Sequence, residues 1–595
     1  MTATVESAAA RVPAPVGHLA NEAQGINFWR HDRAFRDLMT RYLAPELLTH
    51  LQPHFDRLGQ LAGGRLDELA RLADRNPPIL HPRDKFGRDE DWIEYHLSYR
   101  EMEKIAYQEF GMHAVTHRGG VLDWPDPLPP SVKFALQYLF GQAEFGLLCP
   151  VSGSDTSAYI IGRFGSEALQ RYLLPRMLSQ DPAILWKGAQ FMTEKAGGSD
   201  VGALETTAEP VGRNALGLQE WKLFGDKWFC SHTDAEVVMI LARPTGAGPG
   251  TRGLGLFAMP RWLPDGTRNS YRIARLKDKL GTRSMASGEL LLDGATAYLV
   301  GDVQRGFAQM IEQVNLCRIS HGARAAAMMR RCLNEALVVA RSRTAFGGKI
   351  IDKPLLRRQL MKIMVPTEQA LSMVTYAAHL MDIDDDATLR LITPLLKFRA
   401  CRDNIKVAAG SLEVRGGNGY IEDFVHARLV RDAQLGTLWE GTSNINALDA
   451  VTRAVKKNKG DQAVHAAMHA LLAASAVPDG LRAELARYLD RALQFAAELA
   501  ADPDGEAECR TAATGLYNAI TAVLLATEGA DFGADGGDAR RLLISRLVIN
   551  HRLCASNPLS YQKFDGEDAI IDRLLEETAV PLTEATDLLD AAAAR

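Results

Sequence analysis

The chain has 595 residues, a formal charge of −5, and 47% hydrophobic and 24% charged residues. This composition is that of an ordinary globular protein, and the length is too great for one hydrophobic core. The acidic balance excludes a globally basic nucleic-acid-binding protein, although it leaves room for a local basic patch. No run of about 18 apolar residues occurs, so we expect no membrane span. Seven dispersed cysteines without a CxxC pair predict reduced thiols and a cytoplasmic location.

Taken in chain order, the patterning predicts an α+β protein of several domains. Residues 1–25 form an Ala/Pro-rich arm, and residues 26–187 have the helical period of an N-terminal helical domain. Residues 188–302 contain short β-branched runs between turn residues, which predicts a middle β domain that is either a barrel or a sandwich. Helical periodicity then predicts a C-terminal four-helix bundle in residues 303–460 and an additional helical domain in residues 461–595.

The segment Leu435–Asp449, LGTLWEGTSNINALD, is the most informative stretch of the sequence. It places the carboxylate of Glu440 behind Trp439 in a turn of small residues, where a ligand can approach closely. The following hydroxyl and amide groups can hydrogen-bond a polar ring or a phosphate. The alternative is an ordinary helix start capped by Thr442 or Ser443.

Two further motifs lie in the predicted β domain. GAQFMTEKAGGSDV, residues 188–201, has a tight glycine turn, and Thr193 and Ser199 could bind a polar heteroaromatic ring. It matches neither phosphate-binding glycine motif, so a plain hairpin is the alternative. In GDKWFCSHTD, strand alternation predicts that one of Trp228 and Phe229 faces a ligand and the other the core; packing of both in the core is the alternative.

Two glycine turns occur in the predicted bundle. In RSRTAFGGK, residues 341–349, Arg343 is suited to phosphate recognition and Phe346 can stack on a ligand. A solvated loop between helices is the alternative interpretation. LEVRGGNGY, residues 412–420, provides a second glycine turn shortly before the carboxylate motif.

Together these motifs resemble the acyl-CoA dehydrogenase flavoprotein family over roughly residues 148–459. TEKAGGSDV resembles the family signature TEPxAGSD, and WEGTSNIN resembles YEGTxxIQ. RTAFG and VRGGNGY resemble the motifs R-x-x-FG and GGxGY/F. LKDKLGTRSMASGEL, residues 276–290, is similar to the branch of the adaptive-response protein AidB, as are the long N-terminal helical segment and the helical tail.

The resemblance implies FAD bound at a subunit interface of a homo-oligomer, with a tetramer expected. Arg343 and Phe346, with the glycine turn near residue 416, would reach the FAD of a neighbouring subunit. Asn444 stands where the family usually has Gln, and Asn315 where it often has Asp. Ser199, Arg318 and Trp439 would contact the acyl-CoA or fatty acyl substrate. Motif matching implies these cofactor-binding residues: Phe191, Met192, Thr193, Gly198, Ser199, Phe229, Ser231, Arg343, Phe346, Glu413, Gly416, Gly417, Thr442 and Asn444.

The resemblance also implies that Glu440 is the general base of an α,β-dehydrogenation. Enclosure by Trp439 and flavin would raise its pKa, so that it removes the α proton of an acyl thioester while hydride leaves for flavin N5. An acceptor such as an electron-transfer flavoprotein would take the electrons. A flavin oxidase is a rival, although Glu440 argues against its nitroalkane-oxidising version, which uses Asp.

The alternative function is an AidB-like flavoprotein with a DNA-associated or lipid-binding role and weak or no turnover. Residues 461–595 carry 22 acidic and 11 basic side chains, so we do not expect this domain to bind nucleic acid. The dense basic run Arg453–Lys459 reads as a solvated helix end. His465 and His469 lie one helical turn apart but lack the glutamate of HExxH and a third ligand, so no metal site is expected.

Overall fold

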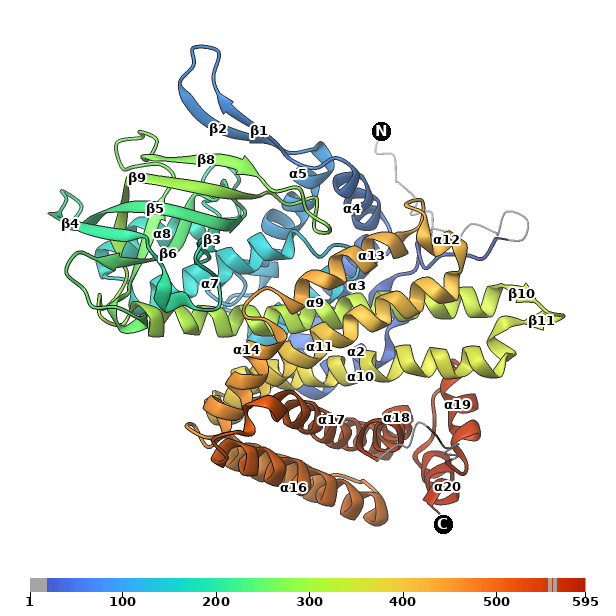
Figure 1. The fold of residues 1–595 in the computed structure, drawn as a ribbon. Coiled ribbons are helices and arrows are strands. Elements are labelled where there is room, and N and C mark those ends of the chain that lie inside the picture. Colours follow the sequence, from blue (N-terminus) through green and yellow to red (C-terminus); the bar gives the residue numbers. More distant parts are fainter. Residues whose placement is uncertain (1–18, 555–558, 560–563, 594–595) are drawn as a thin grey trace.

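The computed structural model describes residues 19–554, 559 and 564–593, and it has the predicted α+β architecture (Figure 1). The arm predicted for residues 1–25 lies outside the described residues except for residues 19–25. Long central helices run beneath the N-terminal helices, a β domain lies at one end of them, and the C-terminal helices lie along their opposite side.

The N-terminal region is helical, with one exception. A hairpin, β1 (Ile79–Arg83) and β2 (Asp89–Glu94), interrupts the helical period predicted for residues 26–187. Burial alternates along β2, where Asp91 and Ile93 are buried and Trp92 is exposed, so a period of two prevails there. The helices are α1 (Phe28–His31), α2 (Arg33–Tyr42), α3 (Pro45–Ala62), α4 (Arg65–Arg75), α5 (Leu97–Glu103), η1 (Lys104–Glu109), η2 (Val121–Asp123), α6 (Pro130–Gly141), α7 (Leu148–Phe164) and α8 (Glu167–Met177).

The strand pairings of the β domain resolve the choice between barrel and sandwich. β4 pairs with β5, β5 with β9, β9 with β7, β7 with β6, and β6 again with β4, so the ring closes as a barrel. β3 adds to β6 in parallel, and β8 adds to β9. The elements are β3 (Gly188–Phe191), η3 (Val201–Ala203), β4 (Thr207–Arg213), β5 (Gln219–Ser231), β6 (Val237–Pro244), η4 (Thr251–Gly253), β7 (Gly255–Pro260), β8 (Tyr271–Leu276) and β9 (Ser287–Leu299).

Three long helices form the bundle, and shorter helices occupy the fourth position. The predicted fourth helix is interrupted, because α14 is short and continues as the π-helical η7, while α13 packs separately against α9 and α11. A small hairpin and η5 join α9 to α10. The elements are α9 (Gly306–Ser342), β10 (Thr344–Ala345), β11 (Gly348–Lys349), η5 (Ile350–Asp352), α10 (Pro354–Asp382), α11 (Asp386–Arg415), α12 (Gly417–Tyr420), α13 (Val425–Ala433), η6 (Gln434–Thr437), α14 (Ser443–Leu448) and η7 (Asp449–Val455).

The described part of the C-terminal domain is helical and docks on the bundle through α17, which contacts α10 and α11. The glycine-rich stretch of residues 529–537 does not end α17 at its start, since α17 continues to Ala534. Gly529 serves close packing instead, because a Cβ there would lie 2.2 Å from the main-chain nitrogen of Leu542. The elements are α15 (Gly460–Ala474), α16 (Asp479–Ala501), η8 (Gly505–Glu508), α17 (Cys509–Ala534), α18 (Arg540–Val548), η9 (Ile549–Leu553), α19 (Glu567–Leu575) and α20 (Leu582–Ala593).

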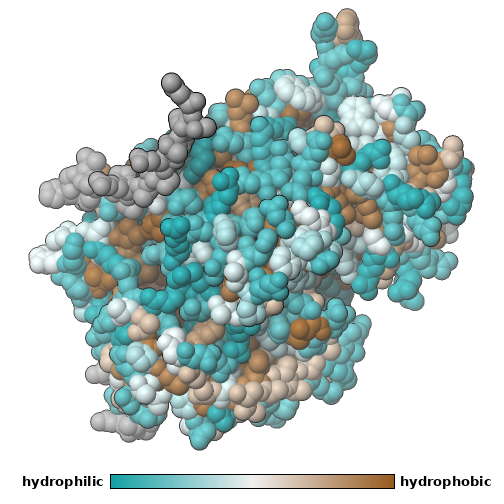
Figure 2. All heavy atoms as spheres, turned by 180° about the vertical axis from the view of Figure 1, so that it is seen from behind, coloured by the Kyte–Doolittle hydropathy of each residue, from teal (hydrophilic) through white to brown (hydrophobic). Residues whose placement is uncertain are grey.

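The surface has an ordinary mixture of residue types. On the face drawn in Figure 2, hydrophilic residues predominate and hydrophobic ones occur in small scattered groups. Within the described residues, no helix combines the length and apolar character that crossing a bilayer requires.

Candidate active site

The turn that carries Glu440 is held in a left-handed backbone conformation. Glu440 has φ +54° and Gly441 has φ +90°, which a residue with a side chain rarely adopts. A Cβ at Gly441 would lie 2.9 Å from Ile445 Cγ2. Thr442 occupies the N-cap position of α14, as the alternative interpretation required, but its side chain makes no capping hydrogen bond. The turn therefore presents the Glu440 carboxylate rather than a capped helix.

The two oxygens of Glu440 differ in their surroundings. Oε1 accepts a hydrogen bond of 2.8 Å from Gln190 Nε2, whereas Oε2 is buried and has no hydrogen-bond partner among the described residues. Burial raises the pKa of Glu440 above its ordinary value, and Lys397 and Arg318 oppose that rise. A half-buried carboxylate with a raised pKa and one buried oxygen that accepts no hydrogen bond from the described residues is suited to accepting a proton.

An ionic network fixes the backbone of this turn. Arg318 Nε donates to the main-chain oxygen of Glu440 at 3.1 Å, and its Nη1 donates to Asp449 Oδ2 at 2.6 Å. Arg390 Nη2 donates to the other oxygen of Asp449 at 2.6 Å. Asn315 adds an acceptor to Arg318 at 3.0 Å. The guanidinium of Arg318 therefore orients the turn; the contact with substrate predicted for it stays a prediction.

Lys397 and Trp439 hold the other side of the turn. Lys397 is buried, and its Nζ donates to the main-chain oxygen of Gly436 at 2.6 Å. Burial lowers the pKa of Lys397 below its usual range. The Trp439 ring lies 5.3 Å from the ring of His321, so it closes the site on the side of α9.

The glycine motif after β3 and the aromatic pair on β5 lie together. Trp228 donates its main-chain N–H to the carbonyl oxygen of Thr193 at 2.8 Å, and a Cβ at Gly198 would lie 3.1 Å from Thr193 Oγ1. The prediction that one aromatic faces the core is wrong, since Trp228 is half-buried and Phe229 is 55% exposed. A register shift between Lys227 and Cys230 interrupts the strand alternation there.

The remaining residues predicted at this face vary in exposure. Phe191 is fully buried in the core, Met192 is half-buried, and Ser199 is exposed. Ser231 Oγ lies 3.3 Å from Ser287 Oγ.

An open cavity of about 610 Å³ adjoins this face. Ser287 lines it, as do Lys277, Lys279 and Arg283. The Lys277 ammonium lies 3.3 Å above the Trp228 ring. Burial lowers the pKa of Lys279 to about 8. Asp74, Asp278 and Glu422 also line the cavity, so its charge is mixed, and Lys277 is the basic group that lies against the aromatic pair.

A second group of predicted residues lies around β10, β11 and α12, at the opposite end of the bundle from α14 (Figure 1). Phe346, at φ +50° in the turn between β10 and β11, is 92% exposed. Arg343 Nη1 lies 3.5 Å from the position that a Cβ on Gly416 would take, so the two glycine turns meet. Glu413 and Gly417 are exposed beside them. Within a single chain, this group does not lie beside the Glu440 carboxylate. Asn444, which is near that carboxylate, is exposed on α14.

Sequence reasoning missed three residues around Glu440. Gln190 is the polar residue in the otherwise apolar strand β3, and Lys397 and Arg324 are cations in apolar stretches of α11 and α9. Each is a polar side chain in a stretch whose apolar neighbours predict burial, and a buried polar group indicates a functional residue.

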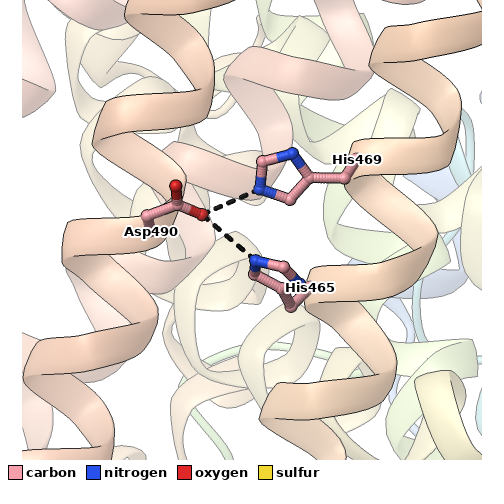
Figure 3. Close-up of side chains that lie close together, drawn as sticks. All are labelled: His465, His469 and Asp490. Atoms are coloured by element: carbon pink, nitrogen blue, oxygen red, sulfur yellow. Dashed lines mark hydrogen bonds and ion pairs between the residues drawn. The ribbon is translucent and has the colours of Figure 1, made fainter.

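One exposed cluster in the described residues has the composition of a metal site. His465 and His469 of α15 point toward Asp490 of α16, with Nε2 to Oδ1 distances of 3.4 Å and 2.8 Å (Figure 3). The third group that the sequence left unidentified is therefore Asp490. The premise that the two histidines lack a third potential ligand is therefore wrong, while the expectation of no metal site stays a prediction.

The comparisons with known proteins agree with this architecture. Residues 19–181 match the AidB N-terminal domain family, residues 189–295 the acyl-CoA dehydrogenase middle domain and residues 304–456 the acyl-CoA dehydrogenase C-terminal domain. Acyl-CoA dehydrogenase family member 11 of Caenorhabditis elegans is 31% identical, covering 71% of this chain and 69% of its own. AidB of Escherichia coli (strain K12) is 32% identical, covering 67% and 73%. The crystal structure of C. elegans ACDH-11 with C11-CoA superposes with a TM-score of 0.82 at 26% identity, covering 93% and 96%.

The chain therefore belongs to the acyl-CoA dehydrogenase family of oxidoreductases. Its N-terminal region and its similarity to AidB assign it to the AidB branch of that family, as the sequence motifs predicted.

Proposed function

We propose that this protein catalyses the α,β-dehydrogenation of an acyl-CoA thioester with Glu440 as the general base. The observation that carries the proposal is the half-buried Glu440, whose buried Oε2 has no partner among the described residues and whose pKa burial raises. Oε2 is the atom to receive the α proton. Gln190 holds Oε1, and Arg318 fixes the main chain, so the base keeps one orientation.

The residues of the glycine motif and the aromatic pair fit FAD as the cofactor. Gly197 and Gly198 are exposed, and a Cβ at Gly197 would meet no atom within 4 Å, so the turn leaves room for a planar ring. The exposed Phe229 offers a stacking surface. Thr193, Gly198, Ser199, Phe229 and Ser231 would hold the ring. FAD, when bound, supplies the acceptor for the hydride that leaves the β carbon.

A homo-oligomer, with a tetramer expected, would complete the cofactor site. Phe346, Leu355 and Tyr420 are among the most exposed large hydrophobic residues, and their segments lie at one end of the bundle (Figure 1). Such exposure favours an interface. Arg343 beside Gly416 would there meet the diphosphate of the neighbouring subunit's FAD.

The substrate and acceptor follow from the same reasoning. The worm relative binds C11-CoA, which supports an acyl-CoA substrate here. An electron-transfer flavoprotein would accept the electrons. A DNA-associated or lipid-binding protein without turnover remains the alternative, and the same experiment separates it from a dehydrogenase.

The test is an anaerobic titration of the purified flavoprotein with acyl-CoAs of graded length, following flavin absorbance. We expect bleaching by one length class and none in Glu440→Gln that retains FAD. An oxidised flavin throughout the wild-type series would reject the dehydrogenase proposal and favour the non-catalytic alternative.

A further inference from the structure

Arg324, near the middle of α9, is a fully buried cation without a carboxylate partner. Its side chain is 1% exposed. The other fully buried arginines differ from it: Arg331 lies 3.0 Å from carboxylate oxygens of Asp67 and Glu335. No ion pair joins Arg324 to a carboxylate in the part of the chain that the structure describes. An unpaired charge in the interior is costly, so it calls for a functional explanation.

The contacts of Arg324 leave part of the guanidinium unused. Nε donates to the main-chain oxygen of Ser320 at 3.3 Å, and Nη2 lies 3.4 Å from His321 Nε2. Nη1 is buried without a hydrogen-bond partner among the described residues. The rings of Phe145 and Trp439 lie 5.4 Å and 5.9 Å from its Cζ. The cation therefore stands between apolar walls with one free donor group.

No neighbouring group on α7 or α9 supplies the missing negative charge. Burial raises the pKa of Cys149 to about 11 and that of Cys317 well above its usual range, so both thiols stay protonated. Burial also holds the pKa of His321 well below its usual range, which leaves the ring neutral. The remaining nearby anion is Glu440, which shares the Trp439 wall but forms no ion pair with Arg324.

We propose that Arg324 is an anion subsite for the acyl group, so that the preferred substrates are thioesters of dicarboxylic acids, whose free carboxylate pairs with this guanidinium. The inference rests on the proposed function, because it assumes that an acyl-CoA occupies the Glu440 site. The planar guanidinium matches a carboxylate, and the aromatic walls suit the methylene groups between the two ends.

The test compares CoA esters matched in carbon number: succinyl with butyryl, glutaryl with pentanoyl, and adipyl with hexanoyl. Binding is measured by calorimetry to the FAD-loaded Glu440→Gln protein, which prevents turnover, with and without Arg324→Met. We expect at least one dicarboxylic ester to bind about 30-fold or more tightly than its partner, since a buried charge pair is gained. Arg324→Met should bring the ratio close to one, and Arg324→Lys should retain part of it.

Thermal unfolding supplies a readout that does not depend on any CoA ester. Arg324→Met should melt at or above the wild-type temperature, because it removes an unpaired buried charge; clearly lower melting would indicate a structural arginine and contradict the proposal. If Arg324→Met fails to fold, the ratio of dicarboxylic to monocarboxylic ester affinities in the protein that keeps Arg324 still tests the proposal. Monocarboxylic esters that bind as tightly as dicarboxylic ones overturn the inference while the proposed function stands, whereas no binding of either class overturns both.

Discussion

Asp449 offers a quantitative test of how the Glu440 turn is held. Asp449→Asn keeps the shape of the side chain but removes the charge that pairs with Arg318 and Arg390. The Arg318 pair is 6% and 7% exposed, so losing it should cost about 3–5 kcal/mol. Arg390 is 24% exposed, and its pair adds only about 0–1 kcal/mol. Because the amide keeps one acceptor, we expect the local loss to fall near 3 kcal/mol, or roughly a 100-fold change in an opening equilibrium.

Hydrogen exchange of peptides covering residues 435–449 measures this opening locally, which suits a protein of several domains. Asp449→Asn should speed exchange there by roughly 100-fold and slow flavin reduction, since a misplaced base loses rate steeply. Arg390→Gln is the matched control and should change exchange by less than about fivefold. Wild-type exchange and wild-type reduction in Asp449→Asn would refute the role assigned to this network.

Three further changes test neighbouring parts of the account. Gln190→Leu removes a hydrogen bond to the charged carboxylate and should raise the pKa of Glu440 further. Activity needs the deprotonated base and is lost as pH falls through that pKa, so the acidic limb of the kcat/KM profile should move to higher pH. An acidic limb at the wild-type pH would count against this hydrogen bond. Gly441→Ala places a Cβ on a residue with positive φ and close to the side chain of Ile445, which should introduce about 1–3 kcal/mol of strain. We therefore expect a lower melting temperature and a slower reaction. An unchanged melting temperature would show that the turn is not constrained. Arg541→Met removes an ion-pair partner from the buried Glu368 and Glu528 and should destabilise the protein by about 3–5 kcal/mol. Limited proteolysis should then release the C-terminal helices more easily. Equal protease resistance would contradict a role of Arg541 in docking these helices.

The parts of the site that could be predicted from sequence are those in which local chemistry dictates the backbone. Local sequence predicts left-handed or tight backbone at four places: the carboxylate followed by glycine at residues 440–441, and the glycine turns near residues 198, 347 and 416. The order of helical, β and helical regions follows from periodicity in the same way.

The rest depends on contacts that the sequence does not display. Gln190 is 250 residues from Glu440, and only the pairing of β3 with β6 and its packing on α7 bring it there. The register shift in β5 exposes Phe229, which an alternating pattern cannot foresee. The hairpin β1–β2 resembled a helix because apolar residues in a short run fit either period.

The most direct measurement is exchange of the α protons of an acyl-CoA in D₂O under anaerobic conditions, followed by mass spectrometry. We expect the wild-type flavoprotein to incorporate deuterium at the α carbon, and we expect Glu440→Gln, while still binding the thioester, not to. Incorporation at the wild-type rate in Glu440→Gln would show that another group removes the proton and would contradict the role of Glu440.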